Sequence, residues 1–178
     1  MNTTDTDATL APFPMPDLDL SAPLDRFRRT VSSEWTDLNG HMNVGFYVVV
    51  FDHATGTLCD QLGLGWDYTR TKIGTTFIIE AHVTYDREVV EGDPLRVTTQ
   101  ILDYDAKRLH YIHKMYHEHE GYLAATNELM LMNIDMSTRR AAPWPAWAMR
   151  PIEQMAEAHA ALPRPPQAGR VIGIRRRN

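Results

Sequence analysis

The feature that most constrains the fold is a change of hydrophobic period in the middle of the chain. In residues 44–62 the apolar positions recur at steps of four, three, four and four, which is typical of one helix face. From residue 77 onward apolar and polar residues alternate, which indicates strands near 77–85, 95–101, 109–118 and 122–136. A sheet must bury one face, and the 44–62 helix is the large apolar partner available. The sequence therefore predicts an α+β fold with antiparallel strands wrapped around one long central helix.

The segments outside this pattern complete a single-domain prediction. Residues 27–35 are expected to form a short strand, which makes the sheet five-stranded. Turns at Glu91–Pro94 and Asp103–Lys107 suggest that the later strands pair in chain order, as a meander. Prolines break residues 1–24 into an N-terminal tail, mobile before about Leu10, and a helix is expected at 151–162. The domain is thus 25–140, with a C-terminal helix and basic tail, 141–178, packed on it.

Composition excludes several classes of function. The chain has 178 residues, 43% of them hydrophobic, and a formal net charge of -5, so it has no general attraction for nucleic acid or anionic lipid. The single cysteine, Cys59, cannot form an intrachain disulfide and is expected in the core, and the first seven residues lack the features of an export signal. No apolar run is long enough to span a bilayer. We expect a cytoplasmic protein with no nucleic-acid or membrane partner.

The residues best suited to chemistry lie directly before the predicted helix, in the segment 36–43. A carboxylate (Asp37), an imidazole (His41) and an amide (Asn43) lie within seven positions, next to backbone N–H groups that have no acceptor inside the helix. Such a helix start can stabilise a developing oxyanion. Each residue also has a plainer interpretation: Asp37 as a turn or cap residue, His41 as a loop hydrogen-bonding group, and Asn43 as the helix cap.

The pattern Asp-x-x-Gly-His-x-Asn between a strand and a helix resembles the 4-hydroxybenzoyl-CoA thioesterase-like branch of the hotdog fold, over about residues 27–136. The matching residues are Asp37, Gly40, His41, Asn43, Tyr47, Tyr85 and the turn Gly92-Asp93. Residues 37–47, together with the extension Gly169-Arg170-Val171-Ile172, are also similar to the betainyl-CoA thioesterases of carnitine breakdown. The resemblance implies hydrolysis of a small acyl-CoA thioester. It also implies no metal or redox cofactor, with coenzyme A entering only as part of the substrate, and a homodimer or tetramer joined through sheet edges.

The resemblance also implies roles for the residues before the helix. Asp37 would be the catalytic carboxylate, either as nucleophile or as general base on a water molecule. The backbone N–H of Val44 would polarise the thioester carbonyl, and one such donor contributes about 3 kcal/mol. From their own chemistry, His41 could orient Asp37 or the substrate carbonyl, and Asn43 could position water unless it caps the helix.

Aromatic and basic side chains are the candidates for binding the substrate. Aromatic rings attract a desolvated quaternary ammonium group, although core packing explains any one of them equally well. The aromatic candidates are Trp35, Phe46, Tyr47, Trp66 and Tyr68. The phosphates of CoA would be held by basic residues, which are otherwise solvated surface charges. The candidates are Arg70, Lys72, Arg170 and, less favoured, Arg175–Arg177.

Other polar residues carry weaker signals. Four histidines on or after the predicted third long strand are expected to be structural or surface residues, because one strand cannot close a tetrahedral metal site alone: His110, His113, His117 and His119. Four polar strand residues could face the active-site cleft, although a solvent-facing position is the default expectation: Glu80, His82, Asn127 and Glu128. Two alternatives to a thioesterase remain open on the same fold. One is an enoyl-CoA hydratase-like enzyme, and the other is an acyl-CoA-binding regulatory module without turnover.

Overall fold

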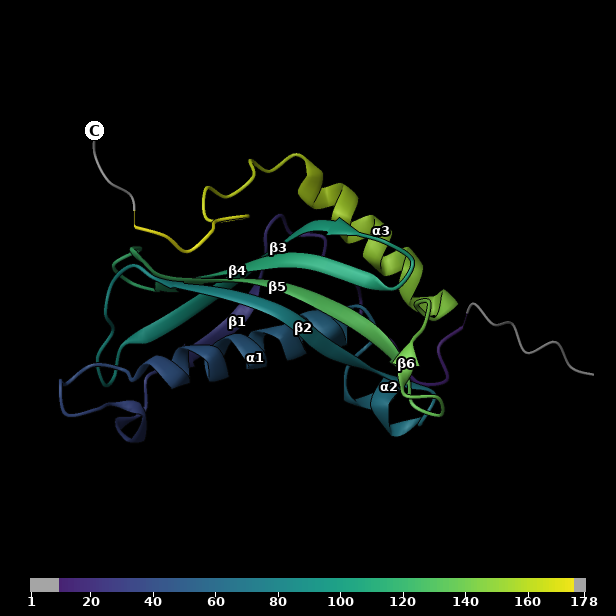
Figure 1. Ribbon diagram of the computed structural model, residues 1–178, viewed down its shortest axis with the longest axis horizontal. Coiled ribbons are helices and arrows are strands. Elements are labelled where there is room, and N and C mark those ends of the chain that lie inside the picture. The colour runs from purple at the N-terminus through teal and green to yellow at the C-terminus, as the bar shows by residue number, and fades with distance from the viewer. Residues whose placement is uncertain (1–9, 175–178) are drawn as a thin grey trace, which may run out of the picture.

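One curved antiparallel sheet crosses the molecule, with a long helix along one face (Figure 1). The structure is a computed structural model that describes residues 10–174, so the expectations for residues 1–9 and for Arg175–Arg177 lie outside it. The elements are β1 (Leu24–Thr30), the 3-10 turn η1 (Ser33–Trp35), α1 (Val44–Gln61), α2 (Trp66–Arg70), β2 (Gly74–Tyr85), β3 (Pro94–Tyr104), β4 (Arg108–His117), β5 (Leu123–Asp135), β6 (Arg140–Ala141) and α3 (Ala146–Ala160). The predicted α+β architecture of a sheet around a central helix is confirmed.

The order of the strands is β1-β3-β4-β5-β2, and two-residue β6 pairs with β5. The predicted meander is therefore wrong at one step, because β2 pairs with β5 rather than with β3. The reason is that α1 runs under the sheet from the β1 edge and delivers the chain to the opposite edge. Residues 86–93 then cross back past the start of α1, where the Met42 N–H donates to the carbonyl oxygen of Val89 at 2.8 Å.

The central helix begins and ends close to where its sequence predicts. Asn43 is the N-cap residue, and its side-chain oxygen accepts the backbone N–H of Gly45 at 3.0 Å. At the other end Gly63 has φ of 67°, the left-handed conformation that favours glycine after a helix. The side of α1 toward the sheet is buried, whereas Val44, Val48 and Val49 on its first turns stay exposed.

Three boundaries differ from the predictions. The first strand is shorter than expected and is followed by η1, so Trp35 lies in a 3-10 turn. The five-residue α2 lies between the predicted helix and the first long predicted strand, where the sequence predicts no element, because so short a helix shows no periodicity. The C-terminal helix begins at Ala146 and runs through Pro151, which the prediction placed at its start.

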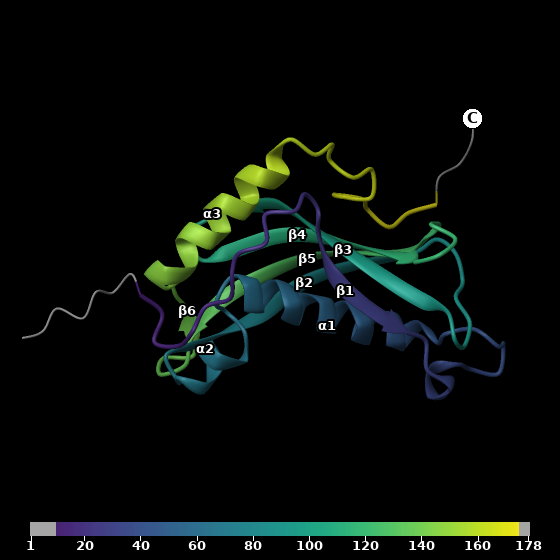
Figure 2. The same cartoon turned by 180° about the vertical axis from the view of Figure 1, so that it is seen from behind.

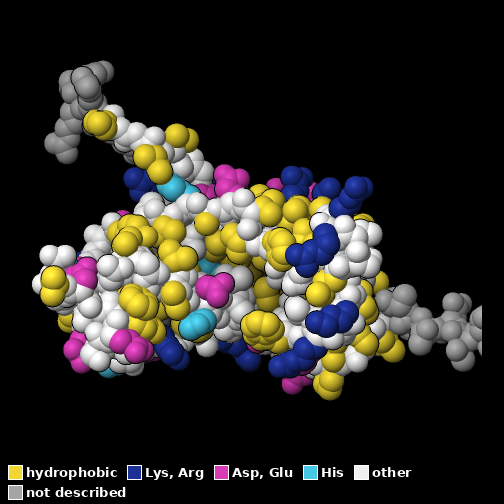
Figure 3. Space-filling model, turned by 60° about the horizontal axis from the view of Figure 1, so that its bottom comes forward, with side chains coloured by type: hydrophobic (Ala, Val, Ile, Leu, Met, Phe, Trp, Pro, Cys, Tyr) yellow, Lys and Arg dark blue, Asp and Glu magenta, His cyan; other side chains and the backbone are white. Residues whose placement is uncertain are grey.

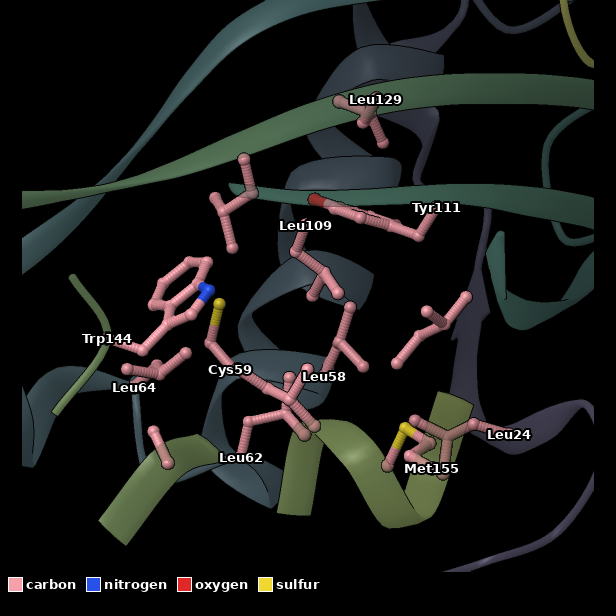
Figure 4. Close-up of a cluster of buried hydrophobic side chains, with 14 of the residues drawn as sticks. Leu24, Leu58, Cys59, Leu62, Leu64, Leu109, Tyr111, Leu129, Trp144 and Met155 are labelled. Atoms are coloured by element: carbon pink, nitrogen blue, oxygen red, sulfur yellow. The ribbon is translucent and has the colours of Figure 1, made fainter. Parts of the chain in front are cut away.

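Helix α3 packs beside the part of β3 that β1 does not pair with. The pairing of β1 with β3 reaches only to Thr99, and beyond it His159 of α3 accepts the Ile101 N–H through Nδ1 at 2.9 Å. Leu58 and Leu62 of α1 point toward Met155 of α3 and Leu24 of β1 in one apolar cluster (Figure 4). Seen from behind, the N-terminal segment before β1 runs along the same side (Figure 2). The apolar side of the C-terminal half of α1 is thus covered by sheet, strand and helix.

A buried polar row crosses the sheet beneath α1. In register, the buried polar residues Thr99, His113 and Asn127 stand side by side on β3, β4 and β5, and Val83 of β2 follows them. The His113 ring is fully buried between hydroxyl groups, with Nδ1 2.8 Å from Thr99 and Nε2 3.0 Å from Thr55 of α1. Burial lowers the pKa of His113 to about 3, so the ring is neutral at physiological pH. Asn127, expected to face solvent, is instead buried, and its side-chain oxygen has no partner within residues 10–174.

We expect His113 to make stability depend on pH. In the unfolded chain a histidine takes up a proton near pH 6.5, whereas the folded one resists it down to about pH 3. Acidification between these values therefore favours the unfolded chain, by about 1.4 kcal/mol per pH unit for one proton. Urea unfolding from pH 6.5 to 4.5 should show a steeper loss of free energy in the wild type than in His113→Gln, which cannot protonate. Parallel profiles for the two proteins would contradict the assignment.

Candidate active site

The loop before α1 is a tight turn held by backbone hydrogen bonds. The Asp37 N–H donates to the carbonyl oxygen of His41, and the Gly40 N–H donates to that of Asp37, both at 3.0 Å. Thr36 and Met42 form an isolated β-bridge that closes the loop. Gly40 has φ of 82°, a conformation that a side chain would strain. The local sequence Asn-Gly therefore dictates the turn that presents Asp37.

The Asp37 carboxylate has one fixed oxygen and one free oxygen. Its Oδ1 accepts the backbone N–H of Asn39 at 2.8 Å, which is an Asx turn. No donor within residues 10–174 bonds its Oδ2, and the side chain is half-buried. The turn interpretation and a chemical role are therefore compatible, because different oxygens serve each.

The first backbone N–H of the helix is also free. Asn43 accepts from Gly45 through its side chain and from Phe46 through its carbonyl oxygen. The Val44 N–H, by contrast, donates to no acceptor in the described part of the chain. A helix N-terminus with an unused N–H carries partial positive charge, which favours a developing oxyanion beside it. Asn43 thus acts as the cap, one of the two roles that the sequence left open.

His41 points toward a residue that the sequence did not single out. Its Nε2 lies 3.2 Å from a carboxylate oxygen of Glu88, which lies in the 86–93 crossing segment. Both side chains are substantially exposed, at 41% and 64%. The wrong strand order explains the omission, because a β2–β3 hairpin would have kept Glu88 away from the start of α1.

The predicted aromatic residues lie at two opposite ends of α1. Near its start, Trp35 stacks on Phe46 with ring centroids 5.7 Å apart, and Tyr47 meets Tyr85 edge-on at 5.2 Å. Trp35 and Tyr47 are buried and belong to the core. Trp66 and Tyr68 lie beyond the C-terminal end of α1. The 18 residues of α1 span about 27 Å, so these two rings lie far from those at its start.

The residues of this second end differ in exposure. Tyr68 is buried and donates to Asn133 at 3.0 Å, whereas Trp66 is 73% exposed. The fold of a single chain therefore does not bring the predicted aromatic set together.

The basic candidates are likewise divided. Arg70 and Lys72 are exposed at the α2 end, where Arg70 pairs with Asp67 at 2.8 Å. Arg170 is exposed in the C-terminal segment, which lies over the opposite face of the sheet from α1 (Figure 1). That segment is held by the Gly169 N–H, which donates to Glu128 at 2.7 Å. Glu128 also bonds His110 and is mostly buried, so its predicted solvent exposure is wrong.

The histidines show no arrangement for a metal. His110 pairs with Glu128, His113 lies in the buried row, and His117 approaches Asp93 at 3.4 Å. Within residues 10–174 no group of three or more His, Cys, Asp or Glu side chains is placed to hold a metal ion. Cys59 is buried in the apolar cluster, and burial raises the pKa of its thiol to about 12. No helix in the described range is long and apolar enough to cross a membrane.

The amino-acid sequence matches the thioesterase-like superfamily over residues 31–152. The chain belongs to this superfamily. The predicted identity as a hotdog-fold acyl-CoA thioesterase is thereby confirmed.

Three relatives of this thioesterase stand out. It is 37% identical to a betainyl-CoA thioesterase of Pseudomonas aeruginosa, over 87% of this chain and 98% of that protein. It is also 37% identical to an L-carnitine dehydrogenase/betainyl-CoA thioesterase of Ruegeria pomeroyi, over 93% of this chain but only 34% of that longer protein. Among solved structures, a Staphylococcus aureus protein in complex with CoA is 32% identical, with a TM-score of 0.79 over 85% of this chain and 98% of its own.

Replacement of Asn43 will separate its capping role from any role in the reaction. Asn43→Ala should lower the free energy of unfolding by about 1 kcal/mol, because the Gly45 N–H loses its acceptor. Asn43→Ser keeps a capping oxygen and should restore most of that loss, as measured by urea unfolding. If the thioesterase activity of Asn43→Ser also returns to the wild-type level, Asn43 acts as a cap alone. A stable Asn43→Ser protein with impaired activity would instead assign it a part in positioning water.

Proposed function

We propose that this thioesterase hydrolyses betainyl-CoA to betaine and CoA in the cytoplasm. The observation that carries the proposal is its 37% identity to a betainyl-CoA thioesterase over nearly the whole length of both proteins. The free cysteine, Cys59, fits a reducing compartment. The S. aureus relative in complex with CoA supports a CoA thioester as the substrate class.

The chemistry is assigned to Asp37 and to the start of α1. With the thioester carbonyl oxygen at the Val44 N–H, charge developing on that oxygen is stabilised by the helix terminus. The free Oδ2 of Asp37 either takes a proton from an attacking water or itself attacks the carbonyl carbon. The C–S bond then breaks, and CoA leaves as a thiolate that takes up a proton. Attack by water gives betaine directly as its carboxylate, whereas attack by Asp37 leaves a mixed anhydride that a water molecule hydrolyses to betaine and free Asp37. His41, paired with Glu88, acts as a positioning residue beside this centre.

Arg70, Lys72 and Arg170 are proposed to bind the CoA phosphates. Arg70 and Lys72 are exposed beside the turn after β5, where Arg139 and Arg140 add further positive charge. A phosphate group is bound best where several such donors converge. The C-terminal segment, which carries Arg170, lies at the other end of the sheet from α2 (Figure 1), so Arg170 would contribute only across a subunit boundary.

The carboxylate assignment predicts a large effect from a small substitution. Asp37→Asn keeps the oxygen that accepts the Asn39 N–H, so the loop should stay intact. It removes the nucleophile or base, and kcat with betainyl-CoA should fall by about 10²- to 10⁴-fold. Release of CoA thiol measures the rate, and thermal unfolding checks the fold. Full activity in a folded Asp37→Asn protein would refute the assignment, and tight binding of betainyl-CoA without thiol release by the wild type would indicate a regulatory module.

We further propose a homodimer joined through the free edge of β2. The β1 edge is short and carries Asp25, Arg26, Arg28 and Arg29. Strand β2 is twelve residues long, pairs only with β5 among residues 10–174 and exposes Phe77, Ile78 and Ile79. A long apolar edge pairs readily with another strand, and a two-fold axis lets β2 pair antiparallel with its own copy.

A charge on this edge should separate the subunits. Ile79→Lys places a charge where the partner strand would pair, and the 20.3 kDa chain should then elute as a monomer in light-scattering chromatography. Val90→Lys is the matched control, because Val90 is similarly exposed but lies outside the strand. If the Ile79→Lys protein keeps the dimer mass of the wild type in solution, or if the wild type is itself a monomer, this interface is contradicted.

A further inference from the structure

A hollow lies on the side of the molecule that carries α1, away from Asp37. It has a volume of about 550 Å³ and lies between the C-terminal half of α1, α2 and the beginning of β2. Its lining includes Asp52, His53 and Asp60 of α1, Trp66 of α2 and Thr76 of β2. Figure 3 shows this side of the molecule, hollowed near its middle, with hydrophobic, acidic and histidine side chains at the border of the hollow.

The side chains of the hollow are suited to an organic cation. Trp66 is 73% exposed, so a ring face is available to a ligand. The carboxylates of Asp52 and Asp60 have no ion pair or side-chain hydrogen bond within residues 10–174, unlike nearby Asp67, which pairs with Arg70. Burial and the charge of Asp67 raise the pKa of Asp60, which shows a carboxylate without a compensating cation. An aromatic face beside unpaired carboxylates attracts a quaternary ammonium group.

By contrast, the aromatic residues beside Asp37 are already engaged. Trp35 is stacked on Phe46, is 6% exposed and is approached by the Arg29 guanidinium at 5.6 Å. A guanidinium next to the ring disfavours a second cation there. Trp35 therefore offers no free ring face to a trimethylammonium group.

The two ends are too far apart to serve one substrate within a subunit. Asp60 lies 16 residues along α1 from Val44, about 24 Å, whereas the nitrogen of betaine is only two bonds from the reacting carbonyl carbon. A two-fold axis through the middle of β2 brings opposite ends of two subunits close together. It sets the beginning of one β2 beside the end of the other. Thr76, near the beginning, lines the hollow, while Tyr85, at the end, contacts Tyr47 in the first turn of α1.

We infer that the hollow around Trp66 and Asp60 binds the trimethylammonium group of an acyl-CoA whose thioester lies at Asp37 of the partner subunit. This inference rests on the proposed function and on the β2-edge dimer. Each of the two sites then combines the reaction centre of one chain with the cation subsite of the other. Asp52, closer to the middle of α1, adds negative charge near the two-fold axis.

A neutral substrate of the same shape tests the cation subsite. In 3,3-dimethylbutyryl-CoA a carbon atom replaces the nitrogen of betainyl-CoA, so the acyl group keeps its size and loses its charge. Trp66→Leu and Asp60→Asn should each lower kcat/KM for betainyl-CoA by about 10- to 30-fold. They should change it for the neutral ester by less than about threefold. Trp66→Phe, which keeps a ring face, should retain most of the preference.

A substitution outside the hollow serves as the control, and different outcomes overturn the subsite and the proposed function. Asp103→Asn makes the same chemical change at an exposed site outside the hollow and should leave both substrates unaffected. Equal losses on both esters, or no loss on either, in folded Trp66→Leu and Asp60→Asn proteins would overturn the subsite. A wild type that hydrolyses neither ester would instead refute the proposed function.

Mixed dimers test whether the subsite acts across the interface. Asp37→Asn and Trp66→Leu chains carrying different affinity tags would be co-expressed and purified through both tags. If Trp66 binds the substrate whose thioester lies at the partner's Asp37, one of the two sites is intact, and the preference for betainyl-CoA over the neutral ester returns to the wild-type ratio. If Trp66 binds the substrate at Asp37 of its own chain, each site carries one defect and the ratio of the two rates stays low. The second result would overturn the placement across the interface.

Discussion

The structure depends on the passage of α1 beneath the sheet from one edge to the other. An apolar helix of 18 residues crosses under the strands and thereby separates β1 from β2 by the full width of the sheet. The chain must then return to pair β3 with β1, and its return path passes the start of the helix. The Asp37 loop and the 86–93 segment meet there for this reason. The candidate active site is thus a consequence of the strand order.

The interface that holds α1 is not uniformly apolar. Thr55 of the helix and Thr99 of the sheet both bond the neutral ring of His113, which also stacks against Phe51. Such a network fixes the rotation and height of the helix more sharply than hydrophobic contacts do, because a small shift would leave buried polar atoms unpaired. A helix with a fixed position also has a fixed N-terminus. The placement of the Val44 N–H beside the loop therefore depends on polar contacts well inside the core.

Local features of this fold could be predicted from sequence, whereas long-range ones could not. The period of α1, its Asn43 cap and Gly63 stop, and the turn at Gly40 are all encoded within a few residues. The pairing of β2 with β5 joins segments about fifty residues apart, and no local pattern specifies it. Glu88 was missed for the same reason, since its contact with His41 exists only through the return path. Asn127 shows a related limit, because alternation places a residue on a face but does not say that α1 covers that face.

The two ends of α1 carry complementary and incomplete chemistry, and this asymmetry bears on why the chain would function as a pair. The N-terminal end has a free N–H and a positive helix terminus, which stabilise a developing anion, and the Asp37 carboxylate lies beside them. The C-terminal end has the opposite field, from the helix terminus and from Asp60. A single helix cannot bring its own ends together, but two antiparallel helices set each N-terminus beside the other's C-terminus. A substrate whose cationic nitrogen lies three bonds from the oxygen that becomes anionic fits such a pair of opposed fields, and neither end alone supplies both.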